Sequence, residues 1–206
     1  MTARELAEVA VRTCQWVHIF QVQEKRFLED FDRDRNGEYP WEGKDEVSLF
    51  VGDRIFMISA IHHVINGLDY LKKELNVRDE STKEIEAVLK EIAGEEIRRD
   101  LKLLRNMNEH DMEYMTENGR KQDQLQRQIK KNGVTYSINA QWTFVDGEKE
   151  VFFIGNIDMM ELAKSVNKQI KNIDNICRQI FEKYFCLDEG EVNGDVICKW
   201  KIIYAY

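Results

Sequence analysis

Apolar residues recur at intervals of three and four along much of the chain, with charged residues between them. The three longest stretches of this kind are 3–31, about 45–76 and about 157–186. Such spacing gathers apolar side chains on one face of an α-helix. A further helical region begins at Ser81, where Glu84 stands at the spacing of a capping box, and weakens or kinks at Gly94. The pattern therefore predicts four helical regions.

A different pattern lies before the last helical stretch. Residues 134–145 and 148–154 are rich in aromatic and β-branched residues, and Asp146 and Gly147 between them form a pair favoured in tight hairpins. Residues 196–206 have a similar composition and predict a third strand that could join the hairpin. We expect a small antiparallel sheet beside the helices.

The stretch 119–133 is polar and basic, and it predicts a solvated helix that ends at Asn132-Gly133. The expected fold is mainly α: a four-helix up-and-down bundle with a small antiparallel β-hairpin and a C-terminal strand. We expect a single domain over residues 1–206, with the β insertion at about 134–155 and the last strand at about 196–206.

The composition is that of a folded protein, with 43% hydrophobic and 33% charged residues in 206. A net charge of −8 argues against broad nonspecific binding to nucleic acid or anionic membranes, but it leaves room for a local basic site. No secretory signal or membrane-spanning stretch is visible, and the 4 cysteines form no Cys-x-x-Cys pair. These features favour a reducing cytoplasm and no membrane partner.

The densest group of chemically active residues lies between residues 98 and 110. Arg105 and Asn106 are followed by His110, one of only 4 histidines. A histidine can transfer a proton near neutral pH, and an arginine can hold the charge that builds on a phosphate. These are the two needs of RNA cleavage by the 2′-hydroxyl, which requires no metal ion.

The Arg105-Asn106-x-x-x-His110 spacing resembles the Arg-x(4–6)-His motif of the HEPN superfamily, whose members are helical-bundle proteins. Many of them are ribonucleases that need no metal and that dimerise to form a composite site. The resemblance covers the motif and the helical setting of about residues 1–187. It implies that Arg105 and His110 are catalytic, that RNA is the substrate and that the protein is a homodimer without a cofactor. A toxin or defence role, with an antitoxin-like partner, is implied by the family alone.

Other residues near the motif are candidate substrate contacts. On a straight helix Arg105 and His110 point about 140° apart, so a second subunit or a helix break is needed to use both. HEPN toxins often carry a tyrosine two residues after the histidine, whereas this chain has Met112 there and Tyr114 two residues later. The predicted substrate-binding residues are Asn106, Arg98, Arg99, Lys102 and Tyr114.

Two other functions fit the sequence. A non-enzymatic interaction module would use the wide apolar face of the second helix and the aromatic hairpin residues, or it would leave those residues to pack the sheet onto the bundle. A metal-binding bundle would bring histidines of separate helices together, although the Glu-x-x-His pair of di-iron bundles is absent. The histidines concerned are His18, His62 or His63, and His110.

Overall fold

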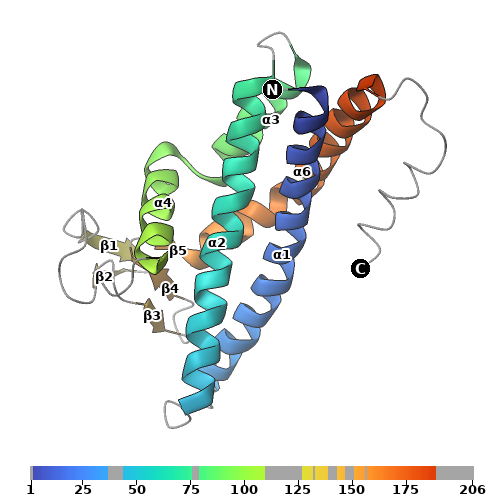
Figure 1. The fold of residues 1–206 in the computed structure, drawn as a ribbon. Coiled ribbons are helices and arrows are strands. Elements are labelled where there is room, and N and C mark those ends of the chain that lie inside the picture. The colour runs from blue at the N-terminus through green and yellow to red at the C-terminus, as the bar shows by residue number, and fades with distance from the viewer. Residues whose placement is uncertain are drawn as a thin grey trace.

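The computed structural model describes residues 2–36, 44–75, 79–109, 127–131, 133–138, 143–146, 151–155 and 157–188. Its helices are α1 (Ala3–Arg35), α2 (Lys44–Glu74), α3 (Glu80–Ile92), α4 (Glu95–Glu109) and α6 (Met159–Asp188) (Figure 1). They confirm the prediction of a mainly helical bundle with a small β decoration. Within the described residues, no helix is both long enough and apolar enough to cross a membrane.

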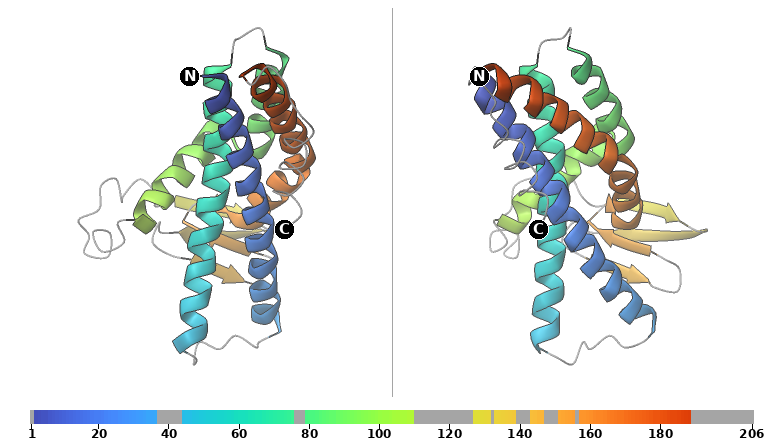
Figure 2. Two further views of the ribbon diagram at one scale, coloured as in Figure 1. Left: turned by 45° about the vertical axis from the view of Figure 1, so that its right-hand side comes forward. Right: turned by 90° about the vertical axis from the view of Figure 1, so that its right-hand side faces the viewer.

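Helices α1, α2 and α6 form the centre of the bundle. Helix α6 begins beside the strands and ends near the start of α1, crossing it at an angle (Figure 2). Their buried side chains form one continuous core, in which Phe20 of α1, Ile61 of α2 and Val166 of α6 are fully buried. Burial of these stripes drives the packing, because apolar side chains gain free energy on leaving water.

Helices α1 and α2 approach each other closely at Gly67. A Cβ atom at this position would come within 2.2 Å of Thr13 Oγ1, so only glycine fits. The Thr13 hydroxyl donates a hydrogen bond to the Val9 carbonyl at 2.8 Å, which satisfies a buried polar group. This contact sets the distance between the two longest helices.

The third predicted helical region is two helices. Helix α3 ends at Ile92, and α4 begins at Glu95 after the extended residue Ala93. The N-cap of α3 is Asp79, whose carboxylate accepts a hydrogen bond from the Ser81 N–H at 3.1 Å. The prediction of a capping box beginning at Ser81 was therefore wrong, since Ser81 already lies inside the helix.

Asp79 also joins α3 to the end of α6. Its Oδ2 atom accepts hydrogen bonds from Lys183 Nζ at 2.7 Å and from the Tyr184 hydroxyl at 2.9 Å. Burial raises the pKa of Asp79, but the bonds from Lys183, Tyr184 and the Ser81 N–H outweigh it and lower the pKa overall. One carboxylate thus caps a helix and connects it to a second one.

The β structure consists of two separate antiparallel sheets. One pairs β1 (Arg127–Lys131) with β2 (Val134–Ile138), and the other has the order β3 (Thr143–Asp146), β4 (Val151–Ile154), β5 (Ile157–Asp158). The predicted antiparallel pairing is confirmed for β3 with β4, but the first predicted strand, 134–145, is divided between β2 and β3, which lie in different sheets. The predicted helix ending at Asn132-Gly133 was wrong over residues 127–131. Gly133 has φ 77°, a left-handed conformation that lets the chain turn back into β2.

The sheets pack against the bundle through their aromatic residues. The ring of Phe152 on β4 meets that of Phe27 on α1 edge to face, with centroids 4.3 Å apart. Phe153 on the opposite side of β4 packs with Tyr136 of β2. Both phenylalanines are buried, so they hold the sheets in place and offer no partner surface. The predicted strand at 196–206 and Trp142 lie outside the described residues.

Candidate functional site on α2 and α4

Helix α4 has two different faces. Buried residues on one face include Leu101, Leu104 and Met107. On another, residues at steps of four, three and four form a stripe that we name the α4 polar stripe. Its members are Arg98, Lys102, Arg105 and Glu109. Three cations therefore follow one another along a single side of a short helix.

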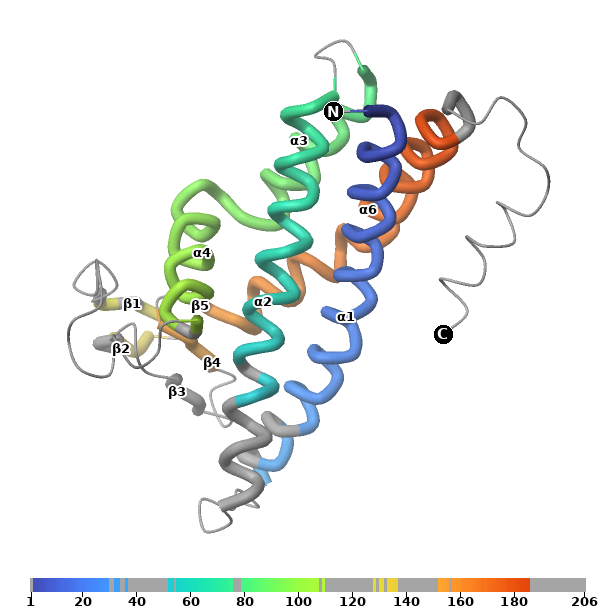
Figure 3. The backbone as a smooth tube through the Cα atoms, viewed as in Figure 1, coloured from blue at the N-terminus to red at the C-terminus, as the bar shows by residue number. Residues whose placement is uncertain are grey.

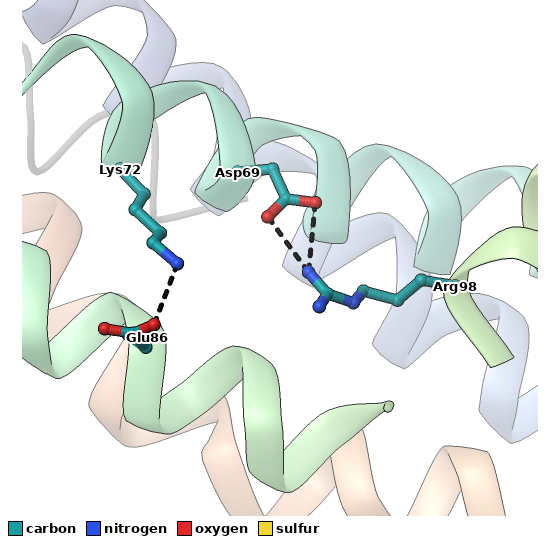
Figure 4. Close-up of polar contacts among 4 residues, drawn as sticks. All are labelled: Asp69, Lys72, Glu86 and Arg98. Atoms are coloured by element: carbon teal, nitrogen blue, oxygen red, sulfur yellow. Dashed lines mark hydrogen bonds and ion pairs between the residues drawn. The ribbon is translucent and has the colours of Figure 1, made fainter. Parts of the chain in front are cut away.

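An ion pair shows which part of α2 faces this stripe. Arg98 Nη1 donates to both oxygens of Asp69 on α2, at 3.1 and 3.4 Å (Figure 4). Helices α2 and α4 run in opposite directions (Figure 3). Arg105 lies seven residues after Arg98, and His62 lies seven residues before Asp69. Since seven residues are about two helical turns, or about 10 Å, the antiparallel register places His62 opposite Arg105.

His62 is a buried imidazole at this position, with 5% of its surface exposed. The Asn66 amide nitrogen lies 3.3 Å from both of its ring nitrogens. Burial lowers the pKa of His62 to about 4, and the charges of Arg105, His63 and Lys102 contribute to the same shift. The influence of Arg105 and Lys102 agrees with the helix register. His62 is therefore neutral at physiological pH.

His63 follows His62 on α2 and is only half buried. Its ring stacks on Trp16 of α1, with centroids 4.1 Å apart and planes inclined by 15°. Burial and then the charge of Arg105 lower the pKa of His63, whereas the carboxylate of Glu109 raises it. A largely neutral imidazole, partly open to solvent, thus stands near a guanidinium.

Arg105 is held in place by acceptors on its own helix. Its Nη2 atom pairs with Glu109 Oε1 at 2.5 Å, and its Nη1 atom donates to Asn106 Oδ1 at 3.4 Å. A guanidinium has five N–H donors, so these two bonds leave donors for a further acceptor. A phosphate would suit the remaining donors, because arginine binds its oxygens in a bidentate fashion.

The structure brings together some of the predicted site residues. Lys102 and Arg105 share the stripe, and Asn106 contacts Arg105, whereas Arg98 is committed to Asp69. Arg99 pairs with the adjacent Asp100 and is 63% exposed. His110 and Tyr114 lie outside the described residues, so their predicted roles stay predictions.

The sequence did not predict that five further residues belong to this site, namely His62, His63, Asn66, Trp16 and Glu109. The only signal for them was the adjacent pair of histidines on an apolar helix. A histidine in such a helix is usually a hydrogen-bonded core residue. The helix register that joins them to Arg105 depends on contacts between distant parts of the chain. In the described segments, no three His, Cys, Asp or Glu residues come together to hold a metal ion.

The apolar face of α2 packs mainly against other helices inside the bundle. Met57, Ile58, Ile61 and Leu68 are buried, so most of this face is covered by other helices. Phe56 and Tyr70 differ, with 58% and 46% of their surfaces exposed. Among the described side chains of α2, the predicted interaction surface is thereby reduced to these two rings.

Comparisons with known proteins identify no family for this chain. No protein-family model matches the chain, and no curated protein or solved structure matches it. The HEPN resemblance therefore rests on the motif and on the helical setting alone.

Proposed function

We propose that this protein binds RNA along the α4 polar stripe and cleaves it without a metal ion. The observation that supports this most directly is the position of Arg105, which the register of α2 and α4 places opposite the buried imidazole of His62. A fixed cation and a neutral base are the two groups that metal-independent RNA cleavage requires. The resemblance of Arg105-Asn106-x-x-x-His110 to the HEPN motif adds to this proposal.

In the proposed reaction, an imidazole takes the proton of a 2′-hydroxyl, whose oxygen attacks the adjacent phosphorus. The P–O5′ bond breaks, the 5′-oxygen takes a proton from water, and a 2′,3′-cyclic phosphate is formed. The imidazolium then gives its proton to the hydroxide that remains, which restores the neutral base. Arg105 stabilises the charge on the phosphate oxygens. His110 is the proton acceptor implied by the motif, and His63 is the partly exposed imidazole beside Arg105.

Binding would depend on a local patch, because the chain carries a net charge of −8. Lys102 and Arg99 are exposed and supply phosphate contacts beside Arg105. Each contact of this kind releases counterions, so RNA affinity falls as the salt concentration rises. Glu109 opposes binding through its negative charge.

The deciding experiment is incubation of single-stranded RNA with the protein in EDTA. We expect fragments that end in a cyclic phosphate, and we expect Arg105→Ala to reduce cleavage by at least about 100-fold. Lys171→Ala, which changes an exposed lysine on α6, is the matched control and should retain full activity. Intact RNA at high protein concentration would refute the proposal.

The two candidate proton acceptors are separated by His63→Gln and His110→Gln. Loss of cleavage with RNA binding retained identifies the acceptor. If both variants cleave as fast as the unaltered protein, neither imidazole is the proton acceptor and the proposed mechanism is refuted.

We also propose that the active species is a dimer, because HEPN proteins form composite sites from two subunits. Light scattering at several protein concentrations should give a mass near twice 24.4 kDa. An antitoxin-like protein partner is part of the same proposal. A monomer that cleaves RNA at full rate would refute the role of the dimer.

A second candidate function is protein binding through α2, which the exposed ring of Phe56 favours. Phe56→Asp would then abolish capture of a partner, whereas Arg105→Ala would leave capture unchanged. The reverse result would favour the RNA site.

A further inference from the structure

A cavity of about 390 Å³ lies where α3, α4, β1, β4, β5 and α6 meet. Its volume is within the range of about 300–1,000 Å³ that is typical of small-molecule sites. It is lined by other residues than the α4 polar stripe, since the α4 residue at its wall is Ile97. This cavity is therefore a separate candidate site.

The walls of the cavity are mainly apolar. Phe153, Ile157 and Leu162 are buried in the surrounding core and present hydrocarbon to the cavity. Ile97 differs, because 39% of its surface is exposed. An apolar ligand would remove part of this surface from water, which is favourable.

The polar part of the cavity is centred on an ion pair that keeps spare donors. Lys131 Nζ pairs with Asp158 Oδ2 at 2.5 Å, and Asp158 Oδ1 accepts the Glu161 N–H at 3.2 Å, so each carboxylate oxygen already accepts one hydrogen bond. An ammonium group has three N–H donors, and among the described residues Asp158 takes one of those of Lys131. The group that fits beside this pair is an additional acceptor.

The surrounding charges favour an anion. Lys130 also borders the cavity and has no ion pair with any described residue. Glu161, the other carboxylate at the wall, pairs with Lys164 at 3.3 Å. The cation of Lys130 is therefore the one charge at this wall without an opposite charge among the described residues.

From these features we infer that the cavity binds a small amphipathic carboxylate. The apolar body lies against Ile97, Ile157 and Leu162. The carboxylate balances the charge of Lys130 and accepts a hydrogen bond from a spare N–H of Lys131. Charge-assisted hydrogen bonds of this kind are about twice as strong as neutral ones. This inference is independent of RNA binding.

The test is calorimetric titration of the full chain with decanoate, below the concentration at which it forms micelles. We expect one site, with decanol and decylammonium binding at least about tenfold more weakly because they lack the anion. Equal binding of the three probes, or no decanoate binding at millimolar concentration, would overturn the inference.

Two substitutions test whether decanoate binds in this cavity. Ile97→Asp places a carboxylate at the cavity wall and should weaken decanoate binding by at least about tenfold through loss of apolar contact and repulsion. Val22→Asp is the matched control, since Val22 is an exposed apolar residue of α1, 46% exposed, and does not line the cavity. Equal weakening by both substitutions, or by neither, would overturn the assignment to this cavity. Circular dichroism should show that both variants keep the helical fold.

Discussion

The neutral state of His62 makes the stability of the bundle dependent on pH. In the folded protein its pKa is about 4, whereas an imidazole in the unfolded chain titrates near 6.5. Between these two values the unfolded chain binds a proton that the folded protein does not bind. Stability is therefore complete above about pH 6.5 and falls progressively as the pH is lowered towards 4.

The magnitude follows from the two pKa values. Each pH unit between them costs about 1.4 kcal/mol, so lowering the pH from neutral to about 5 costs about 2 kcal/mol through His62. His63 contributes in the same direction, because its pKa is also lowered. A loss of this size is a large part of a typical folding free energy of about 5–15 kcal/mol.

The perturbation is His62→Gln, which removes the titrating group but keeps a polar side chain next to Asn66. We expect the free energy of unfolding to fall by at least about 2 kcal/mol between about pH 7.5 and about pH 5 in the unaltered protein. The decrease should be smaller by about 2 kcal/mol in the variant. Urea denaturation followed by circular dichroism at both pH values measures these differences. His18→Gln, which replaces an exposed histidine of α1, is the control and should behave as the unaltered protein does.

Carboxylates also titrate towards the acid end of this range. Burial raises the pKa of Glu24, which opposes the effect of His62 near pH 4.5. Comparing the two proteins at each pH cancels such contributions. If His62→Gln and the unaltered protein lose the same free energy on acidification, the imidazole is not held neutral by burial, and the reasoning is refuted.

Three further substitutions test other contacts. Gly67→Ala should destabilise the protein by about 1–3 kcal/mol in thermal unfolding, because its methyl group collides with Thr13; an unchanged melting temperature would contradict the close helix contact. Asp79→Ala should cost about 2 kcal/mol by removing the N-cap of α3 and the bond from Lys183, and a loss below about 0.5 kcal/mol would mean that this carboxylate does not join the helices. Glu109→Gln should strengthen RNA binding several-fold at low salt, since it removes a negative charge beside the guanidinium, and weaker binding in a filter assay would argue against phosphate contact there.

Local patterns in the sequence predicted the helices well. The three long apolar stripes became α1, α2 and α6, because side-chain periodicity reports directly which face of a helix is buried. The break at Gly94 and the β3–β4 hairpin were also predicted, since both depend on residues adjacent in the chain. The predictions that failed concerned two signals that are also local but were misinterpreted.

Strand β1 is the first case. Its sequence, Arg127–Lys131, is polar and basic and by itself suggests a solvated helix. Its partner β2 begins only two residues later, and the intervening pair Asn132-Gly133 is favoured in tight hairpins, although it was interpreted as the end of a helix. The start of α3 is the second case, since Asp79, two residues before Ser81, is itself a preferred N-cap residue.

The candidate site depends on both local and tertiary information. By itself the sequence determined that Arg105 would lie on a polar helical face near other cations, because charge and periodicity are local properties. Only the tertiary structure decided that His62 and His63 would stand near that arginine. The physical reason is that the register of these two antiparallel helices, in which Arg98 pairs with Asp69, depends on packing between segments far apart in the chain, and no pattern within either helix encodes it.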